Sequence, residues 1–464
     1  MAYWHRMGLG AAAAAALVLG CESQAERQVQ PAPAGCLTLL FASDNQGVLS
    51  SCGCPSNPSG GFAKRQTLID KYRRVRPDVI VVDGGDLFPE RPNAVKVKYL
   101  ATALGRATYD AVALGDQEFG LGLEELRSLA GEHGLPFICA NVRDEAGSLV
   151  FPPHVIREAG GRRIGIFAVT ADQAYGFPPR EWRKGLKVEP PLEAARREVK
   201  DLAGCDLVVA LSHQPLPDTQ ELARSVPGIH VVVNGHGDAI LRKPLSVGAA
   251  LVVACGPVGR EMGALTFSPG PDGPPARQGD AVASPAAAMQ MIGLSERTVR
   301  DAPWVMDLYW QYVKKAKGEA PPDWALTPQP AAYEPADKCG ACHEKEHKQW
   351  LSTRHARAYA TIKRAGRHED PECILCHTMG YGRRGGFFSM EETPALGAIT
   401  CQACHPVTSI HGNKVDKIEE KFKPGTFISG RLCISCHGLI QSPDFDYYAY
   451  RPKIAHGPRE AQKK

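Results

Sequence analysis

The sequence has little excess of either charge and few long apolar stretches. It contains 54 Lys and Arg against 50 Asp and Glu, a net charge of +4, which is too small to argue for nucleic acid as a partner. Beyond the apolar run from Leu9 to Leu19, no stretch is long and apolar enough to span a bilayer. We therefore expect no nucleic-acid binding, and a mature protein that is soluble apart from any lipid anchor.

Methionine is scarce in the last third of the chain, where cysteine and histidine are concentrated. Only Met379 and Met390 occur there, whereas nine of the 15 histidines lie after residue 334. Eight of the 15 cysteines belong to four copies of Cys-x-x-Cys-His. The copies are Cys339, Cys342 and His343; Cys373, Cys376 and His377; Cys401, Cys404 and His405; and Cys433, Cys436 and His437.

This spacing is the attachment pattern of c-type haem, in which both thiols bind the porphyrin covalently and the histidine ligates the iron. Zinc ribbons also contain Cys-x-x-Cys pairs, but they do not need a histidine directly after every second cysteine. A disulfide framework leaves the four histidines unexplained as well. The repeats therefore predict four covalently attached haem c groups.

The N-terminus is typical of an exported protein. His5 and Arg6 precede the apolar run, which ends in Val18-Leu19-Gly20-Cys21. This is a secretory signal, and its end resembles a bacterial lipoprotein cleavage site. The resemblance implies a lipid on Cys21, although an ordinary cleaved signal is the alternative. We expect an envelope or periplasmic protein, lipid-anchored and favouring the outer membrane, because Glu22 is no obvious inner-membrane retention signal.

Composition divides the chain into five parts. Residues 1–21 are the signal and lipid site, 22–35 a flexible tether, 36–268 a first domain, 269–333 a linker with one helix, and 334–464 the haem domain. The linker assignment depends on its proline and glycine content. About 130 residues for four haems implies that the porphyrins form most of the core and lie close together, as in an electron carrier.

Each haem iron needs a sixth ligand or leaves an open face. The remaining histidines of this domain are the candidates: His347, His355, His368, His411 and His456. The stretch Glu344–Ala358, the sequence Cys376-His-Thr-Met-Gly-Tyr381 and Lys453-Ile-Ala-His456 resemble the tetrahaem cytochromes of the hydroxylamine-linked, nitrifier type. The resemblance implies that His355, His411 and His456 are distal ligands. It also implies that the haem on Cys373 and Cys376 has an open face, unless His347 or His368 closes it.

The first domain alternates short β-branched runs with helical patterns, which indicates an α/β fold with a buried sheet. The expected strands are 37–42, 78–83, 111–114, 163–169, 207–212, 229–234 and 251–254, and the expected helices are 63–75, 93–106, 122–132 and 192–203. Polar residues follow several strands. They include Asp44 and Gln46, Asp86, Asp116 and Gln117, His213, and His236 with Asp238.

The order of these residues resembles the calcineurin-like metallophosphoesterases, especially the secreted 5′-nucleotidase branch. That family reads Asp-x-His, Gly-Asp, Gly-Asn-His-Glu, His and Gly-His-x-His. The resemblance implies a four-layer α/β/β/α sandwich and two bound metals, and it makes Arg65 a candidate anion ligand. This chain departs from the pattern at Gln46, Asp116, Gln117 and Asp238, and Gln117 cannot replace the family's catalytic histidine as an acid at neutral pH.

By the family's roles, one ion would be held by Asp86, Asp116, His213 and His236. The other would have only Asp44, Gln46, Asp86 and Asp238, an all-oxygen set that suits Mg²⁺, Ca²⁺ or Mn²⁺. We therefore expect one or two divalent ions, or a fold that has lost its hydrolytic site. The pairing of the remaining cysteines is open: Cys36, Cys52, Cys54, Cys139, Cys205 and Cys255.

The sequence thus predicts an exported, membrane-anchored tetrahaem cytochrome. It would exchange electrons with redox proteins or quinone-linked donors, and its phosphoesterase-like domain would bind a partner or an anion. The alternative is a redox-coupled, metal-dependent hydrolase or oxidoreductase that acts on a phosphorus or sulfur oxyanion or another small substrate. The Sox-type thiosulfohydrolases, which belong to the secreted nucleotidase branch, make a sulfur oxyanion reasonable.

Overall fold

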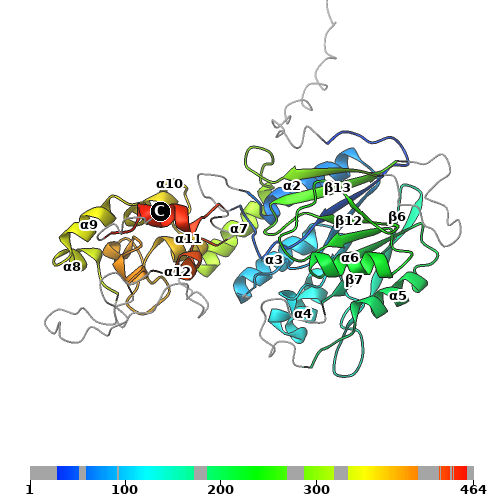
Figure 1. The fold of residues 1–464 in the computed structure, drawn as a ribbon, viewed down its shortest axis with the longest axis horizontal. Helices are drawn as coiled ribbons and strands as arrows, with labels where there is room; N and C mark the ends of the chain where they lie inside the picture. The colour runs from blue at the N-terminus through cyan, green and yellow to red at the C-terminus, as the bar shows by residue number, and fades with distance from the viewer. Residues whose placement is uncertain are drawn as a thin grey trace, which may run out of the picture.

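The computed structural model describes residues 29–51, 59–90, 93–171, 185–268, 287–317, 333–405, 428, 430–438, 442 and 444–456. Cys21, Cys52, Cys54 and His411 lie outside these ranges. The described chain forms a larger N-terminal domain and a smaller C-terminal one, side by side (Figure 1). Among the described residues, no helix is long and apolar enough to cross a membrane.

Two six-stranded sheets form the centre of the N-terminal domain. The first has the order β14 (Ala287–Gly293), β13 (Glu261–Phe267), β1 (Leu37–Ala42), β2 (Val79–Asp83), β3 (Ala111–Ala113) and β4 (Phe137–Ile138). The second has the order β11 (Leu245–Val247), β12 (Ala250–Ala254), β10 (Val231–Asn234), β9 (Leu207–His213), β7 (Arg162–Thr170) and β6 (His154–Ala159). A separate pair joins β5 (Val142–Arg143) to β8 (Lys187–Val188).

The strands that precede the candidate site residues are parallel within each sheet. β1, β2, β3 and β4 pair in parallel, and so do β7, β9, β10 and β12, whereas the outer strands join them antiparallel. Parallel strands need crossover connections, and helices provide these. The loops that follow the parallel strands therefore gather at one edge of each sheet, where α/β proteins build their sites.

Three apolar clusters arrange the domain in layers. Residues such as Phe41, Val82 and Val209 fill the space between the two sheets. The outer face of the first sheet is covered by α2 (Phe62–Val75), α3 (Ala94–Arg106), α4 (Leu123–His133) and α7 (Pro303–Ala316). The outer face of the second sheet is covered by α5 (Pro191–Asp201) and α6 (Leu216–Ser225). The expected four-layer α/β/β/α sandwich is confirmed.

Parts of both expected connectors pack on this domain. β14 pairs with β13, and α7 buries Leu308, Tyr309 and Val313 in the cluster that also contains α2 and α3. The N-terminal domain therefore extends to about residue 316, into the range expected to be a linker. Likewise Val29, in the expected tether, is 4% exposed and lies in the same cluster.

The C-terminal domain consists of short helices and irregular chain. Its α-helices are α8 (Ala336–Gly340), α9 (Glu344–Leu351), α10 (Ala358–Arg364), α11 (Pro371–His377), α12 (Gly430–Ile434) and α13 (Tyr447–Tyr450). Short 3₁₀ turns span Glu118–Leu121 in the first domain and His355–Arg357, Pro394–Leu396, Cys401–Ala403 and Arg451–Lys453 in the second. A small apolar cluster includes Ile362, Ile374, Met379 and Phe387, so the described part of this domain has a small side-chain core.

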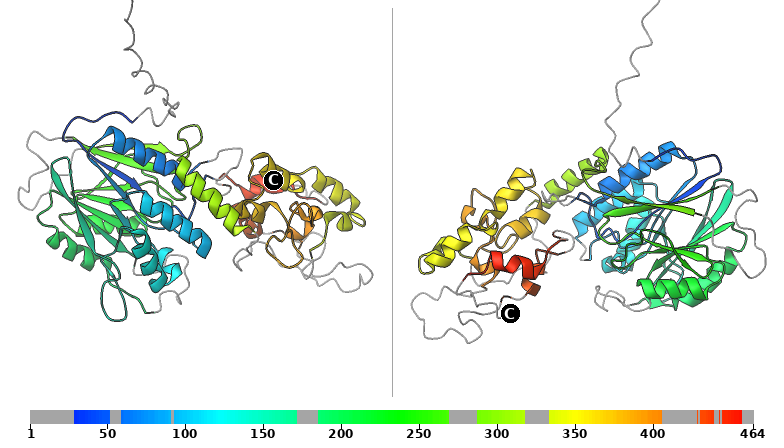
Figure 2. Two further views of the ribbon diagram at one scale, coloured as in Figure 1. Left: turned by 180° about the vertical axis from the view of Figure 1, so that it is seen from behind. Right: turned by 45° about the horizontal axis from the view of Figure 1, so that its top comes forward.

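The two domains meet where α11 approaches α3 and α7 (Figure 2). Glu372 accepts hydrogen bonds from Lys96 at 2.8 Å and from the Tyr312 hydroxyl at 2.9 Å. Arg367 lies over the Tyr309 ring, 4.5 Å from its centroid, and its Nη1 donates to Ser50 Oγ at 3.2 Å. The helix that carries the second Cys-x-x-Cys-His copy is therefore attached directly to the N-terminal domain.

Candidate functional site

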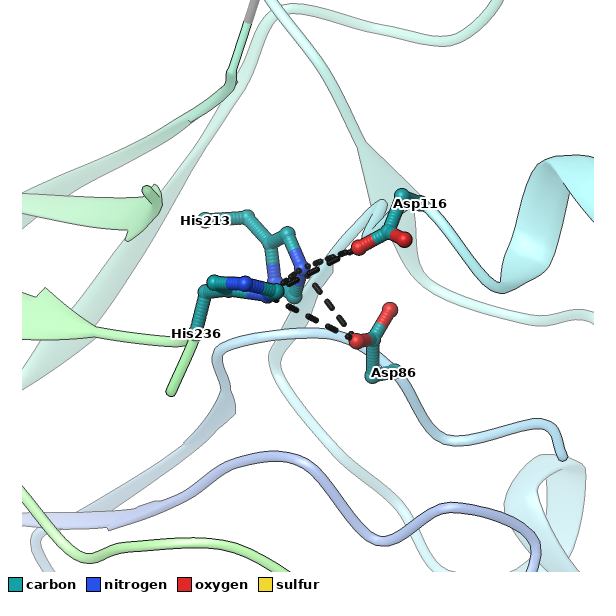
Figure 3. Close-up of side chains that lie close together, drawn as sticks. All are labelled: Asp86, Asp116, His213 and His236. Atoms are coloured by element: carbon teal, nitrogen blue, oxygen red, sulfur yellow. Dashed lines mark hydrogen bonds and ion pairs between the residues drawn. The ribbon is translucent and has the colours of Figure 1, made fainter. Parts of the chain in front are cut away.

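Four side chains from both sheets converge at the carboxyl ends of the parallel strands (Figure 3). Asp86 follows β2, Asp116 follows β3, His213 ends β9 and His236 follows β10. Each offers one ligand atom, and these atoms all lie within 4.8 Å of one another. The structure thus brings together the four residues that the sequence assigned to one ion.

The distances between the ligand atoms suit one metal ion. His213 Nε2 lies 3.1 Å from Asp116 Oδ1, 3.4 Å from Asp86 Oδ2 and 3.2 Å from His236 Nδ1. His236 Nδ1 lies 3.7 Å from Asp116 Oδ1 and 3.9 Å from Asp86 Oδ2. Metal–ligand bonds of about 2.0–2.1 Å would separate tetrahedral ligands by roughly 3.3–3.4 Å, so the four atoms surround a space of the right size.

The first-sheet and second-sheet loops are held together by their backbones. Gly84 and Gly235 pack so closely that a Cβ on Gly84 would lie 2.5 Å from the Gly235 Cα. His213 Nδ1 donates to the Gly84 carbonyl at 2.8 Å. This bond fixes the imidazole tautomer and leaves Nε2 free to accept an ion.

Glu118 fixes the loops that carry the two carboxylates. Its own carboxylate is fully buried and accepts backbone hydrogen bonds from Asp86, Leu87, Phe88 and Gly115, at 2.7–3.1 Å. Burial, and then the charge of Asp86, raise the pKa of Glu118 to about 7. Sequence analysis assigned this glutamate no role, although it directly follows the Asp116-Gln117 motif.

Strained backbone marks the same loops. Asp44, Gln46 and Asp86 have φ values of 48°, 50° and 55°, a left-handed conformation that residues other than glycine adopt rarely and that is concentrated at functional sites. The Asp44 amide donates to Gly85 O and the Gln46 amide to Asp86 O, each at 2.8 Å. These two bonds hold the first loop against the loop of Asp86.

The charges of the site favour a cation. Burial alone would lower the pKa of His213, but the facing carboxylates of Asp86 and Asp116 raise it well above its ordinary value. Burial and the neighbouring His213 lower the pKa of His236. Two carboxylates beside two imidazoles are a donor set that Zn²⁺ and Mn²⁺ accept.

Three residues expected at a second ion are arranged differently. Asp44 is buried, and burial and the charge of Asp86 raise its pKa to about 8. Gln46 is half-buried and hydrogen-bonds to Asp44, while Asp238 is exposed. Neither Asp44 nor Asp238 belongs to the group of four.

The structure also places Arg65, the candidate anion ligand, and four of the cysteines whose pairing the sequence left open. Arg65 is fully buried and donates to Asp83 Oδ2 at 2.8 Å, so its guanidinium is paired with a protein carboxylate below the site. Cys36, Cys139, Cys205 and Cys255 are buried, and none of them forms a disulfide within the part of the chain that the structure describes.

In the C-terminal domain, each Cys-x-x-Cys-His copy forms one helical turn. The amide of the histidine donates to the carbonyl of the first cysteine in the copies ending at His343, His405 and His437, each at 2.9 Å, and the copy ending at His377 lies within α11. Residues i, i+3 and i+4 of a helical turn share one face. Both thiols and the imidazole of each copy therefore face the same side, as covalent haem attachment requires.

Two of these histidines stand opposite a second histidine. The ring centroids of His355 and His437 are 6.1 Å apart, and those of His405 and His456 are 5.6 Å apart. Two imidazoles that bind one ion from opposite sides through bonds of about 2 Å have centroids roughly 6 Å apart. The separations of these two ring pairs match those expected for haems with a histidine on each face.

The histidine of the second motif is oriented for iron but has no such opposite ring among the described residues. His377 Nδ1 donates to Ala358 O at 2.8 Å, which leaves Nε2 available. Of the other candidates, His347 stacks on Trp350 with centroids 5.4 Å apart, and His368 contacts Tyr359 at 6.4 Å.

Comparisons with known proteins agree with both domains. The family model for cytochrome c554 and c-prime matches residues 338–406. Over 227 residues, 44% of this chain, the protein is 29% identical to the 5′-nucleotidase of Bos taurus and covers 38% of that enzyme's length. The chain therefore spans well under half of this relative.

Solved structures show the same fold in the N-terminal domain. A 5′-nucleotidase precursor of Thermus thermophilus superposes with a TM-score of 0.51 and 22% identity, over 61% of this chain and 59% of that one. The sulfate thiohydrolase SoxB of the same organism superposes with a TM-score of 0.51 and 17% identity, over 64% and 62%. The chain thus combines a domain with the fold of the 5′-nucleotidase metallophosphoesterases and a domain similar to cytochrome c554.

Proposed function

We propose that the C-terminal domain carries four covalent haem c groups and transfers electrons between redox partners outside the cytoplasm. The main support is the pair of histidine rings at His355–His437 and His405–His456. An iron with a histidine on each face has no open position, so it exchanges electrons rather than binding a substrate. His411, outside the described residues, is proposed as the distal ligand of another haem.

The packing of the motifs supports rapid transfer between haems. The side chains of Cys339 and Cys401 lie next to each other, and so do those of Cys376 and Cys436. The first motif therefore lies against the third and the second against the fourth. Haems attached at these thiols would lie close together, which is what a chain of carriers requires.

Haem content and redox behaviour test this proposal. The purified chain, produced in a host that attaches haem c, should contain four haems by mass spectrometry. It should also show reversible oxidation and reduction with small-molecule mediators. A chain that takes up zinc at its cysteines, and no haem, would contradict the proposal.

We propose as a second candidate that the N-terminal domain is a divalent-metal site for a phosphorus or sulfur oxyanion. The convergence of Asp86, Asp116, His213 and His236 supports it, as do the names of the relatives, 5′-nucleotidase and sulfate thiohydrolase. A divalent ion bound there would supply Lewis acidity toward an anionic oxygen.

The protein's own residues limit this chemistry. Gln117 is 8% exposed, and its side-chain oxygen has no hydrogen-bond partner. Its backbone amide donates to Asp86 Oδ1 at 3.1 Å, so it orients a ligand, but its carboxamide is not acidic enough to protonate a leaving group. Assays of metal-loaded protein with nucleotides, phosphomonoesters and thiosulfonates test this candidate, and loss of turnover in His213→Ala is expected.

We further propose export and lipid anchoring through Cys21, with redox proteins or quinone-linked donors as partners. The apolar run before Cys21 supports this. Haem c is attached outside the cytoplasm, so a haem-loaded chain must be exported. Replacing Cys21 with Ser should release the haem-loaded protein from the membrane fraction.

A further inference from the structure

The ligand set around His213 is complete for one ion. Asp86, Asp116 and His213 are at most 8% exposed, so their charges must be balanced inside the protein. Two carboxylates and two neutral imidazoles carry a charge of −2, which one divalent ion neutralises. The carboxylate at Asp116 stands where the resembled family has a neutral asparagine, and it supplies half of that charge.

A second ion would find little beside this set. One oxygen of Asp86 already accepts the Gln117 amide. Asp44 Oδ1 is buried and has no hydrogen-bond partner among the described residues, so Asp44 is the one additional carboxylate that a second ion would find.

The turn after His236 does not supply the missing ligand. Asp238 is exposed, follows Gly237 with a φ of 93°, and lies outside the group of ligand atoms. Of the residues expected at the second position, Asp44 is then the one carboxylate left to balance the two charges of a second ion. None of the residues expected there is a histidine.

We infer that the N-terminal domain is a mononuclear centre, in which Asp86, Asp116, His213 and His236 form the whole protein ligand set for one divalent ion. This inference depends on the metal site proposed above and narrows it. One ion provides Lewis acidity, but not the clamp of two ions on attacking and leaving oxygens that binuclear phosphatases use. The centre therefore suits binding or activation of a small anion at a single position.

Metal stoichiometry of the full, haem-loaded chain tests the inference without relying on turnover. The protein is stripped with a chelator and titrated with Mn²⁺, while the spin-resonance signal of free Mn²⁺ reports the unbound ion. One equivalent per chain is expected, and elemental analysis after desalting should agree.

Variants identify which residues hold the ion. Asp44→Asn and the matched exposed variant Asp238→Asn should both still bind one equivalent with at most a threefold change in affinity. Asp116→Asn should bind one equivalent at least tenfold more weakly, since a ligand charge is lost, and His236→Ala should bind it more weakly still. An unchanged Soret band and far-ultraviolet spectrum show that each variant is folded.

The outcomes separate the inference from the function on which it depends. Two equivalents in the wild type, reduced to one by Asp44→Asn, would show a binuclear centre and overturn the inference while the metal site stands. No bound Mn²⁺ and no bound Zn²⁺ in the folded wild type would overturn both.

Discussion

The hydroxyl of Tyr309, on α7, donates a hydrogen bond to the carboxylate of Asp370, which caps the helix of the second haem motif. Asp370 is 1% exposed, accepts from Arg367 Nε at 3.2 Å, and places Oδ2 3.3 Å from Cys373 Sγ. One carboxylate therefore joins the N-terminal domain, the cap of α11 and a haem-attachment cysteine.

Replacing Asp370 with Ala should loosen this junction. The change leaves Arg367 and Tyr309 without their buried acceptor and removes the cap, so we expect a loss of about 2–4 kcal/mol. The haem domain should therefore separate from the N-terminal domain at a lower temperature. Limited proteolysis during heating measures this as earlier cleavage between the two domains.

The ion pair of Lys317 and Glu369 is the matched control at the same boundary. Both side chains are more than half exposed and 2.7 Å apart, and exposed pairs contribute little. Lys317→Ala should change stability by less than about 1 kcal/mol. Equal effects of the two substitutions would mean that the buried junction does not hold the domains.

The pair of Arg65 and Asp83 gives a prediction about pH. Both side chains are fully buried. Burial raises the pKa of Asp83 to about 6, although Arg65 opposes this. Because the pKa of Asp83 is higher in the folded protein than its ordinary value near 4, the contribution of Asp83 to folding stability is greatest below pH 4. That contribution is lost as the pH rises through 6. Arg65→Met should raise this pKa further and destabilise the protein by about 3–5 kcal/mol at pH 8.

The same variant should be less destabilised at pH 5, where Asp83 is protonated. Adding Asp83→Asn to Arg65→Met should recover part of the loss at pH 8, because no buried charge then remains. Thermal unfolding at both pH values measures this. A loss that is independent of pH would assign the effect of Arg65 to packing alone.

The contact of Gly84 with Gly235 predicts that the metal site is sensitive to one methyl group. Gly84→Ala would place its Cβ 2.5 Å from the Gly235 Cα, and the two loops would have to separate. We expect at least a tenfold loss of Mn²⁺ affinity. Gly131→Ala in α4, where a Cβ meets nothing within 4 Å, should leave affinity unchanged and stabilise the helix by up to about 1 kcal/mol.

The histidine pairs predict which haem each distal ligand serves. His355→Ala should convert the haem on Cys433 and Cys436 to a high-spin state, and His456→Ala should do the same for the haem on Cys401 and Cys404. His347→Ala, which removes a ring stacked on Trp350, should leave the spin states unchanged. Spin-resonance spectra of the oxidised variants decide this, and unchanged low-spin signals in His355→Ala would exclude it as a ligand.

Much of the sandwich is predictable because its inner strands are β-branched runs. The runs at 37–42 and 207–212 became β1 and β9, and the pattern at 63–75 became α2. β14 was missed because its sequence, Ala-Ala-Met-Gln-Met-Ile-Gly, has no strand alternation. Its conformation comes from antiparallel pairing with β13, which is a tertiary effect.

The site was predictable as a set of motifs but not as a geometry. The order of the motifs indicated Asp86, Asp116, His213 and His236. Whether Asp44 and Asp238 join them depends on left-handed backbone at Asp44 and on the turn at Gly237, which motif spacing does not encode. The pairing of His355 with His437 likewise depends on chain folding over a long separation.

Haem analysis of the purified full chain tests the central claim most directly. Mass spectrometry of the denatured protein counts covalent haems, and spin resonance of the native protein counts the low-spin irons. The account predicts four covalent haems, at least two of them low-spin with histidine on both faces. A chain with no covalent haem, or one in which all the haems are high-spin, would contradict it.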